Sequence, residues 1–261
     1  MRIVLVGLMA AGLGPFVMAL RANRGTSLLY AVIWALIAWI GWGVVFLAGD
    51  LDHTAMEPAR YCALCLTGCA GIAVLGARRP HVFAWNFVVL GLLSVMLLPL
   101  VETWFIGTRS FDGLRIAFLA ATLAITGVNY LPTRSGIAAL AMLILSAGEL
   151  VLLYAPEWIS GFEAQMVLDA AITMLPWLAY FRWRRTKSLS EADTLWLDFR
   201  DGWGLVWGQR VRDQFNSAAE NAKLPVRLAW SGIENESDLT VDQAKVLATM
   251  RAVLQRFIEA P

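Results

Sequence analysis

Residues 180–187 read YFRWRRTK and mark the sharpest change of composition along the chain. They follow the last long apolar run and precede a polar, Trp-rich tail of ordinary soluble composition. This is the most basic stretch of the chain, and its basic residues are Arg182, Arg184, Arg185 and Lys187. Because the cytoplasmic flanks of membrane helices carry an excess of Lys and Arg, the stretch predicts a cytoplasmic boundary between a membrane domain and a small soluble domain.

The composition of the chain is typical of a membrane protein. Of its 261 residues, 59% are hydrophobic and 16% are charged, whereas about 25% of the residues of a soluble domain are charged. Residues 1–187 contain 13 Lys and Arg against 9 Asp and Glu, and residues 188–261 contain 8 against 11. A mildly acidic tail argues against nucleic acid as a partner. The lipid bilayer is therefore the expected environment.

Seven apolar runs come before the basic stretch, and each is close to the roughly 20 residues that a membrane helix needs. Backbone groups must be paired inside lipid, so these runs predict helices, and they are too long and uniformly apolar for barrel strands. The predicted spans are about 3–20, 28–48, 61–77, 81–101, 114–130, 136–155 and 166–181. We predict an all-α membrane protein, with a seven-transmembrane-helix bundle formed by residues 1–183.

The charges of the connecting loops predict the orientation of this bundle. With seven crossings and the N-terminus outside, nine Lys and Arg residues fall in inner segments and four in outer segments. This bias favours an outside N-terminus and a cytoplasmic C-terminus. Short loops and Arg-rich inner flanks fit a bacterial inner membrane. Arg2 followed by an apolar stretch also fits a cleaved signal peptide, which remains an alternative for the first run.

The tail, residues 184–261, predicts a small cytoplasmic α-rich domain of helix–extended–helix type. Apolar side chains recur at helical spacing over residues 191–221 and again over 247–258, with an alternating, extended piece between them. Large aromatic side chains, which are enriched in binding hot spots, stand on the first helix: Trp196, Phe199, Trp203 and Trp207. They either dock a protein partner or form an intramolecular core beneath the membrane domain.

Three cysteines lie on one face of the third predicted helix, namely Cys62, Cys65 and Cys69. A Cys-x-x-Cys at the outer end of a membrane helix suits an enzyme that exchanges electrons between an external thiol and a membrane quinone. Residues 61–65, YCALC, look like the Cys-x-x-Cys of bacterial disulfide-bond membrane oxidoreductases and vitamin K epoxide reductases. The resemblance implies a redox pair of Cys62 and Cys65, although those families also use a second cysteine pair that this chain lacks. Alternatively, these cysteines pack as small hydrophobes.

Ionisable residues inside apolar runs are costly to bury and therefore suggest function. Glu149 and Asp169 lie in the sixth and seventh runs, and Glu102 and Arg115 lie at the outer ends of the fourth and fifth. We expect an outer-half polar pocket in which these side chains bind a cation, a proton or a substrate amine. The alternative is that Arg115 pairs with one acid and the other reaches the lipid headgroups.

Motifs for metal, haem or nucleophilic chemistry are absent from the sequence. Its two histidines, His53 and His81, fall at opposite faces, which excludes a bis-histidine haem and a histidine metal cluster. Phosphate-binding and Ser-His-Asp motifs are also missing. We therefore expect a non-enzymatic anchoring or interaction subunit, without cofactor, whose Trp-rich C-terminal domain docks a partner. The alternatives are a transporter or small-ligand receptor using Glu149, Asp169 and Arg115, and a quinone-coupled thiol–disulfide oxidoreductase.

Overall fold

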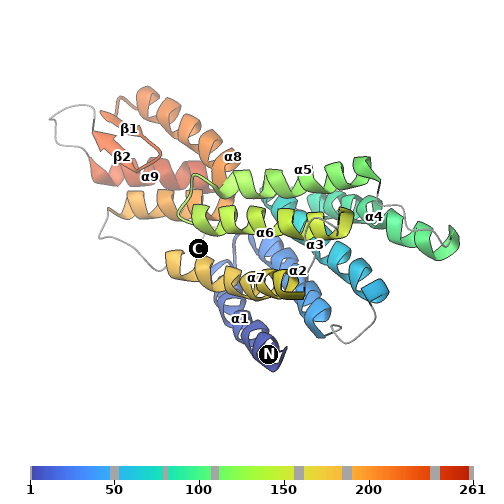
Figure 1. The fold of residues 1–261 in the computed structure, drawn as a ribbon. Helices are drawn as coiled ribbons and strands as arrows, with labels where there is room; N and C mark the ends of the chain where they lie inside the picture. Colours follow the sequence, from blue (N-terminus) through green and yellow to red (C-terminus); the bar gives the residue numbers. More distant parts are fainter. Residues whose placement is uncertain are drawn as a thin grey trace.

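The computed structural model describes residues 2–47, 53–78, 82–106, 112–155, 162–183, 190–235 and 242–258. The helices in these ranges are α1 (Arg2–Ala22), α2 (Leu29–Leu47), α3 (His53–Leu75), α4 (Val82–Ile106), α5 (Gly113–Tyr130), α6 (Gly136–Tyr154), α7 (Phe162–Trp183), α8 (Glu191–Asn221) and α9 (Gln243–Leu254). Two short strands, β1 (Val226–Leu228) and β2 (Ile233–Asn235), stand between α8 and α9. Within these ranges the fold is helical apart from this hairpin, as predicted (Figure 1).

Five of the described helices are long and apolar enough to cross a membrane. These spans are Leu29–Leu47, Met56–Leu75, Phe83–Thr103, Gly113–Tyr130 and Gly136–Tyr154. Shorter apolar stretches, Val6–Ala22 and Gln165–Phe181, lie in α1 and α7. The outward faces of the helices are also apolar, and Phe83, Phe87 and Ile144 are each more than 60% exposed. Such a surface matches hydrocarbon better than water, so the expectation of a membrane protein is confirmed.

Six helices pack in a closed circuit. The neighbours follow the order α1, α2, α3, α5, α6 and α7, and α7 returns to α1, while α4 packs on α3 from outside. Small residues bring α3 close to α5, because a Cβ on Gly71 would lie 2.1 Å from the Thr126 side chain. Small residues at such contacts are typical of membrane helix packing. We call this circuit the helical ring.

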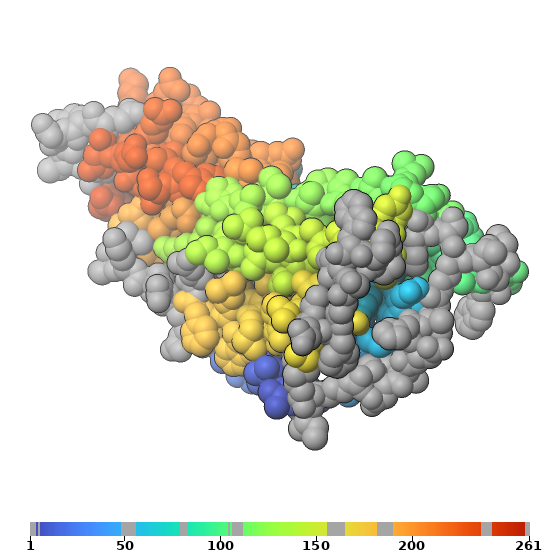
Figure 2. Space-filling view, viewed as in Figure 1, coloured from blue at the N-terminus to red at the C-terminus, as the bar shows by residue number. Residues whose placement is uncertain are grey.

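Residues 190–235 and 242–258, called here the C-terminal segment, form a lobe at one end of the ring (Figures 1 and 2). α8 begins at Ser190, whose hydroxyl accepts a hydrogen bond of 3.1 Å from the Asp193 amide. β1 pairs with β2 in antiparallel fashion, and α9 packs on α8. The predicted extended piece is thus one strand of a hairpin. We call the end of the ring that carries this lobe the docking end, and the opposite end the far end.

Two tryptophans of α8 cap the end of α3. The Trp203 indole N–H donates to the Ala77 carbonyl at 2.9 Å, and that of Trp207 donates to the Val74 and Leu75 carbonyls at 3.2 and 3.1 Å. The last four carbonyls of a helix have no partner within the helix. The indoles supply donors where α3 ends, which fixes the C-terminal segment against the ring.

A break in α8 fits against the last turn of α5. Gly204 has a φ of 77° and a ψ of −165°, which interrupts the helix. The buried Asn129 amide sits in this break, where its nitrogen donates to the Trp203 carbonyl at 3.3 Å and its oxygen accepts from the Val206 N–H at 3.1 Å. One side chain of α5 therefore pairs backbone groups on both sides of the interruption.

Replacing Gly204 should loosen this contact. In Gly204→Ala, the added Cβ would lie 2.2 Å from the Asn129 amide nitrogen at a positive φ, and backbone strain of this kind alone costs about 1–3 kcal/mol. The melting temperature in mild detergent should fall. Gly91→Ala on α4 is the matched control, because a Cβ there meets nothing within 4 Å. Equal melting temperatures of the two variants would contradict the role of the break.

Candidate functional site

Three charged side chains meet inside the ring, one from each of α3, α6 and α7. The Arg60 Nη1 atom lies 2.8 and 2.7 Å from the two Glu149 carboxylate oxygens. Its Nη2 atom lies 2.9 and 3.0 Å from the two Asp169 oxygens. One planar guanidinium therefore holds two carboxylates, the geometry for which arginine is suited. We call this group the ion triad.

The ion triad is buried among apolar helices. Arg60 is 4% exposed, Glu149 is 0% exposed and Asp169 is 15% exposed. Removing one partner from a buried pair leaves an uncompensated charge, which costs about 3–5 kcal/mol. With both acids ionised the group carries one excess negative charge, which a single shared proton would neutralise. The triad can therefore tie three helices together and also hold a proton.

The other two residues expected in this pocket lie elsewhere. The Arg115 Nη1 atom is 2.7 Å from Glu102 Oε2, and these side chains are 30% and 39% exposed. This pair joins α4 to α5 on the surface. The structure thus brings Glu149 and Asp169 together and places Arg115 and Glu102 in a separate pair.

Arg60 is the member of the triad that lies just outside the predicted spans. The predicted third span begins at residue 61, whereas α3 begins at His53 because the polar residues before the apolar run continue the helix. Helical spacing puts Arg60 on the same face as Ala63 and Leu64, both fully buried. The sequence does contain a signal for this triad, namely two acids within apolar runs and an arginine at the edge of a third run.

The three cysteines are free thiols on the buried side of α3. Cys65 and Cys69 are completely buried, and Cys62 is partly buried. Cys69 Sγ lies 3.9 Å from the Val89 carbonyl of α4. This environment is that of small packing residues at a helix contact.

The four aromatic residues considered for partner binding face the chain itself. Trp196 is 0%, Phe199 2%, Trp203 4% and Trp207 6% exposed. Phe199 and Trp203 stack with ring centroids 4.8 Å apart, and Phe257 of the chain's last turn packs against both rings. The geometry corresponds to the intramolecular core that the sequence left open as the second interpretation.

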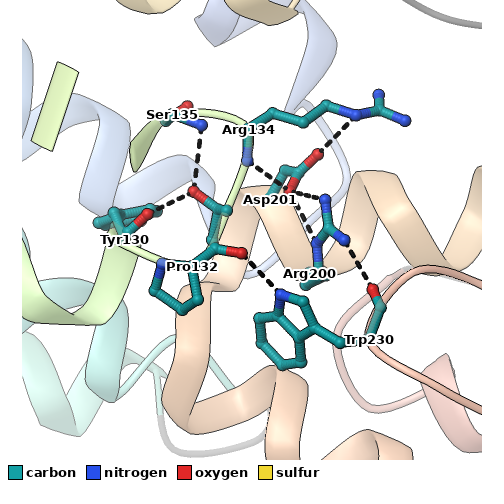
Figure 3. A network of polar contacts seen from close by, with 8 residues as sticks. Tyr130, Pro132, Arg134, Ser135, Arg200, Asp201 and Trp230 are labelled. Carbon is teal, nitrogen blue, oxygen red and sulfur yellow. Dashed lines mark hydrogen bonds and ion pairs between the residues drawn. The ribbon is translucent and has the colours of Figure 1, made fainter. Parts of the chain in front are cut away.

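A network of hydrogen bonds joins the α5–α6 connection to the C-terminal segment (Figure 3). The Asp201 carboxylate accepts hydrogen bonds from the Arg134 backbone N–H at 3.1 Å and from Arg200 Nε at 2.9 Å. The Trp230 indole donates to the Pro132 carbonyl at 2.6 Å. Arg134 Nε lies 3.3 Å from Asp201 Oδ2, but the buried Nη1 of Arg134 has no hydrogen-bond partner among the described residues.

The ring helices line an apolar hollow of about 400 Å³, called here the central cavity. Its walls are mainly Ala, Gly, Val and aromatic rings from all six ring helices. A second hollow of about 420 Å³, the mouth, lies between α1, α7 and α8 at the docking end. Both are lined by Phe16, Ala19, Leu28, Ser135, Pro176 and Ala179, so the two spaces adjoin each other.

Comparison with known proteins leaves this geometry as the basis for function. No protein-family model, curated protein or solved structure matches the chain. Within the part of the chain that the structure describes, no group of three His, Cys, Asp or Glu side chains could hold a metal ion. The ion triad and the central cavity are therefore the features from which a function can be argued.

Loss of the arginine should destabilise the protein more than loss of either acid. Arg60→Met leaves two buried carboxylates unpaired and should cost about 3–5 kcal/mol, seen as a large fall of the melting temperature in mild detergent. Adding Glu149→Gln and Asp169→Asn to Arg60→Met should recover much of that loss. Arg115→Met, at the exposed pair, is the control and should change the melting temperature little. A fall no larger for Arg60→Met than for Arg115→Met would exclude a structural role of the triad.

The cysteines should behave as buried thiols. In mild detergent a maleimide should leave Cys65 and Cys69 unlabelled until the protein is denatured, because both are fully buried. Prior reduction should not increase labelling, since all three thiols are free. Leu114→Cys, at a position 81% exposed, is the positive control. Increased labelling of Cys62 and Cys65 after reduction would instead indicate a disulfide and favour the oxidoreductase interpretation.

Proposed function

We propose that the chain is a seven-span membrane protein that takes a small ligand into its central cavity and acts as a transporter or receptor. The buried ion triad, which bridges three ring helices between that cavity and the far end, is the observation that carries this proposal. In this arrangement the ligand enters from the docking end. The N-terminus lies outside the cell and the docking end lies in the cytoplasm. The membrane is the inner membrane of a bacterium.

The contacts of the C-terminal segment support the seven crossings. It bonds to the α1–α2 connection, where the Ser27 N–H donates to the Phe257 carbonyl at 2.9 Å, and to Ala77 after α3 and Pro132 after α5. It also follows α7 in the chain. Alternate connections at one end are what a bundle requires when each of seven helices crosses once. The basic residues of these connections, among them Arg24, Arg78 and Arg134, favour the cytoplasmic side for that end.

The positions along α3 support a path that is open at one end only. Arg60 lies seven residues before Thr67, the first α3 residue to line the central cavity, a separation of about 10 Å along the helix. On α7, Asp169 lies one turn before Ile172, which also lines the cavity. The ion triad thus lies between the cavity and the far end, and the mouth lies at the docking end. A ligand site reached from one side at a time is what alternating access uses.

In this function each member of the triad has a distinct task. Arg60 holds α6 and α7 against α3 through four hydrogen bonds. Asp169, the more exposed acid, is the group that a proton from the far side reaches first. Protonating Asp169 would weaken its bond to Arg60 and release α7, while Glu149 stays paired. The far end would then open.

The anchoring function has less support than this proposal. The side chains expected to dock a partner, Trp196, Phe199, Trp203 and Trp207, are buried within the chain. A partner would have to displace the C-terminal segment from the ring to reach them. The buried thiols give the oxidoreductase function still less support.

Access to the cavity from each side tests the proposal. In a variant lacking Cys62, Cys65 and Cys69, Ala139→Cys places one thiol in the wall of the central cavity. A membrane-impermeant maleimide should label it in inverted vesicles and not in intact cells. Adding Asp169→Asn should make it reactive from outside the cell as well, because the far end is then weakened.

The control for this experiment is Ala124→Cys, which lies on the outer face of α5. Its labelling should be unaffected by Asp169→Asn. If Ala139→Cys reacts from outside the cell with the triad intact, the proposed closed end is wrong. If neither Asp169→Asn nor Arg60→Gln changes access in a variant that stays folded, the triad is not a gate.

A further inference from the structure

The deep walls of the central cavity offer a ligand almost no free hydrogen-bonding group. The Trp42 indole donates to Thr67 Oγ1 at 3.2 Å, and the Trp39 indole donates to the Met9 carbonyl at 3.2 Å. Thr126 Oγ1 donates to the Thr122 carbonyl at 3.0 Å, and the Tyr130 hydroxyl donates to the Gly202 carbonyl at 2.9 Å. Since these donors are already used, water would find few partners here, and an apolar cavity of this kind takes up apolar ligands.

The size and shape of the space favour one hydrocarbon chain. The central cavity, at about 400 Å³, lies near the lower end of the range of about 300–1,000 Å³ found for small-molecule sites. Small side chains line it from two helices, Ala31 and Ala38 of α2 and Ala138 and Ala139 of α6, which leaves room for a hydrocarbon chain. It adjoins the mouth at one end. A long, thin molecule with a different group at its end fits this shape.

The mouth is lined by a charged side chain that has an unpaired hydrogen-bond donor among the described residues. Arg134 lines the mouth, and its buried Nη1 has no hydrogen-bond partner among the described residues. Figure 3 shows the end of its guanidinium pointing away from the other labelled side chains. Asp201 is already bonded to Arg200, so it does not saturate Arg134. Asp198 also lines the mouth, and burial raises its pKa.

We infer that the central cavity and the mouth together bind one anionic, single-chain lipid of the surrounding membrane, with its hydrocarbon chain in the ring and its acidic headgroup at Arg134. A free fatty acid and a lysophospholipid share this chemistry. The inference rests on the proposed function only in taking the central cavity as the ligand site. It names the class of ligand that the site accepts.

Photocrosslinking tests this inference with the full chain in nanodiscs. A trace of a diazirine analogue of oleic acid is activated by light, and the modified peptides are identified by mass spectrometry. Crosslinks should fall in α2, α6 and α7. Unlabelled oleic acid should compete better than oleyl alcohol, and oleylamine should compete least. Lysophosphatidic acid as a second competitor separates the two lipid sources.

Filling the cavity should remove the crosslinks. Ala139→Phe and Ala38→Phe, on opposite sides of the ring, should each reduce labelling several-fold, whereas Ala124→Phe on the outer face of α5 should not. Two positions are used so that misfolding of one variant, detected by its melting temperature, still leaves a result. Crosslinks that persist in both folded variants, or that map only to the outer faces of the helices, would overturn the inference.

Substituting the arginine tests the headgroup. Arg134→Gln should lower competition by oleic acid about tenfold, as expected for a charge-assisted hydrogen bond, and leave oleyl alcohol unchanged. Arg134→Lys should restore part of the difference. Equal loss for both competitors, or oleylamine as the strongest competitor, would refute the acidic headgroup. If crosslinking is lost but Ala139→Cys still reacts from one side only, the proposed function stands with another ligand. If crosslinking is found but Ala139→Cys reacts from both sides, the cavity is a lipid site without gating.

Discussion

A guanidinium held between two carboxylates, in a place that water hardly reaches, is the constraint on which the helical ring depends. Arg60 is costly to bury alone, and so are Glu149 and Asp169. Their mutual pairing is therefore what allows three ionisable groups to remain among apolar helices. Because each comes from a different helix, the chain reaches this pairing only when α3, α6 and α7 lie side by side at one end.

The opposite end is fixed by a different kind of chemistry. There, hydrogen bonds to backbone groups predominate: indoles of Trp203 and Trp207 bond to the end of α3, and the Asn129 amide fills the break at Gly204. Neutral hydrogen bonds of this sort contribute about 1 kcal/mol each, so many are required. The C-terminal segment is consequently a part of the ring's architecture, and it also forms one wall of the mouth.

Much of the fold could be predicted from apolar periodicity, and the tail helix over residues 191–221 has the predicted bounds. Glu149 and Asp169 were also visible, because an acid within an apolar run stands out in a sequence. Arg60 was not recognised, since it stands where the apolar run begins and reads equally as a loop charge. The central cavity leaves no local pattern at all: alanines such as Ala38 and Ala139 read as packing residues, and only the three-dimensional arrangement places them around a hollow. The number of crossings remains a prediction.

The capping of α3 by α8 also bears on the order in which the protein is made. α3 leaves the ribosome well before residues 190–258, and chains are synthesised at about 5–20 residues per second. For several seconds, therefore, the end of α3 lacks the indole donors of Trp203 and Trp207, although the Ala77 carbonyl already accepts a hydrogen bond from the Ser27 hydroxyl at 2.7 Å. The last turn of α3 gains the remaining donors only when the tail arrives. A chain that stopped early would keep this exposed backbone, a mark by which a membrane protease could distinguish an unfinished copy from a finished one.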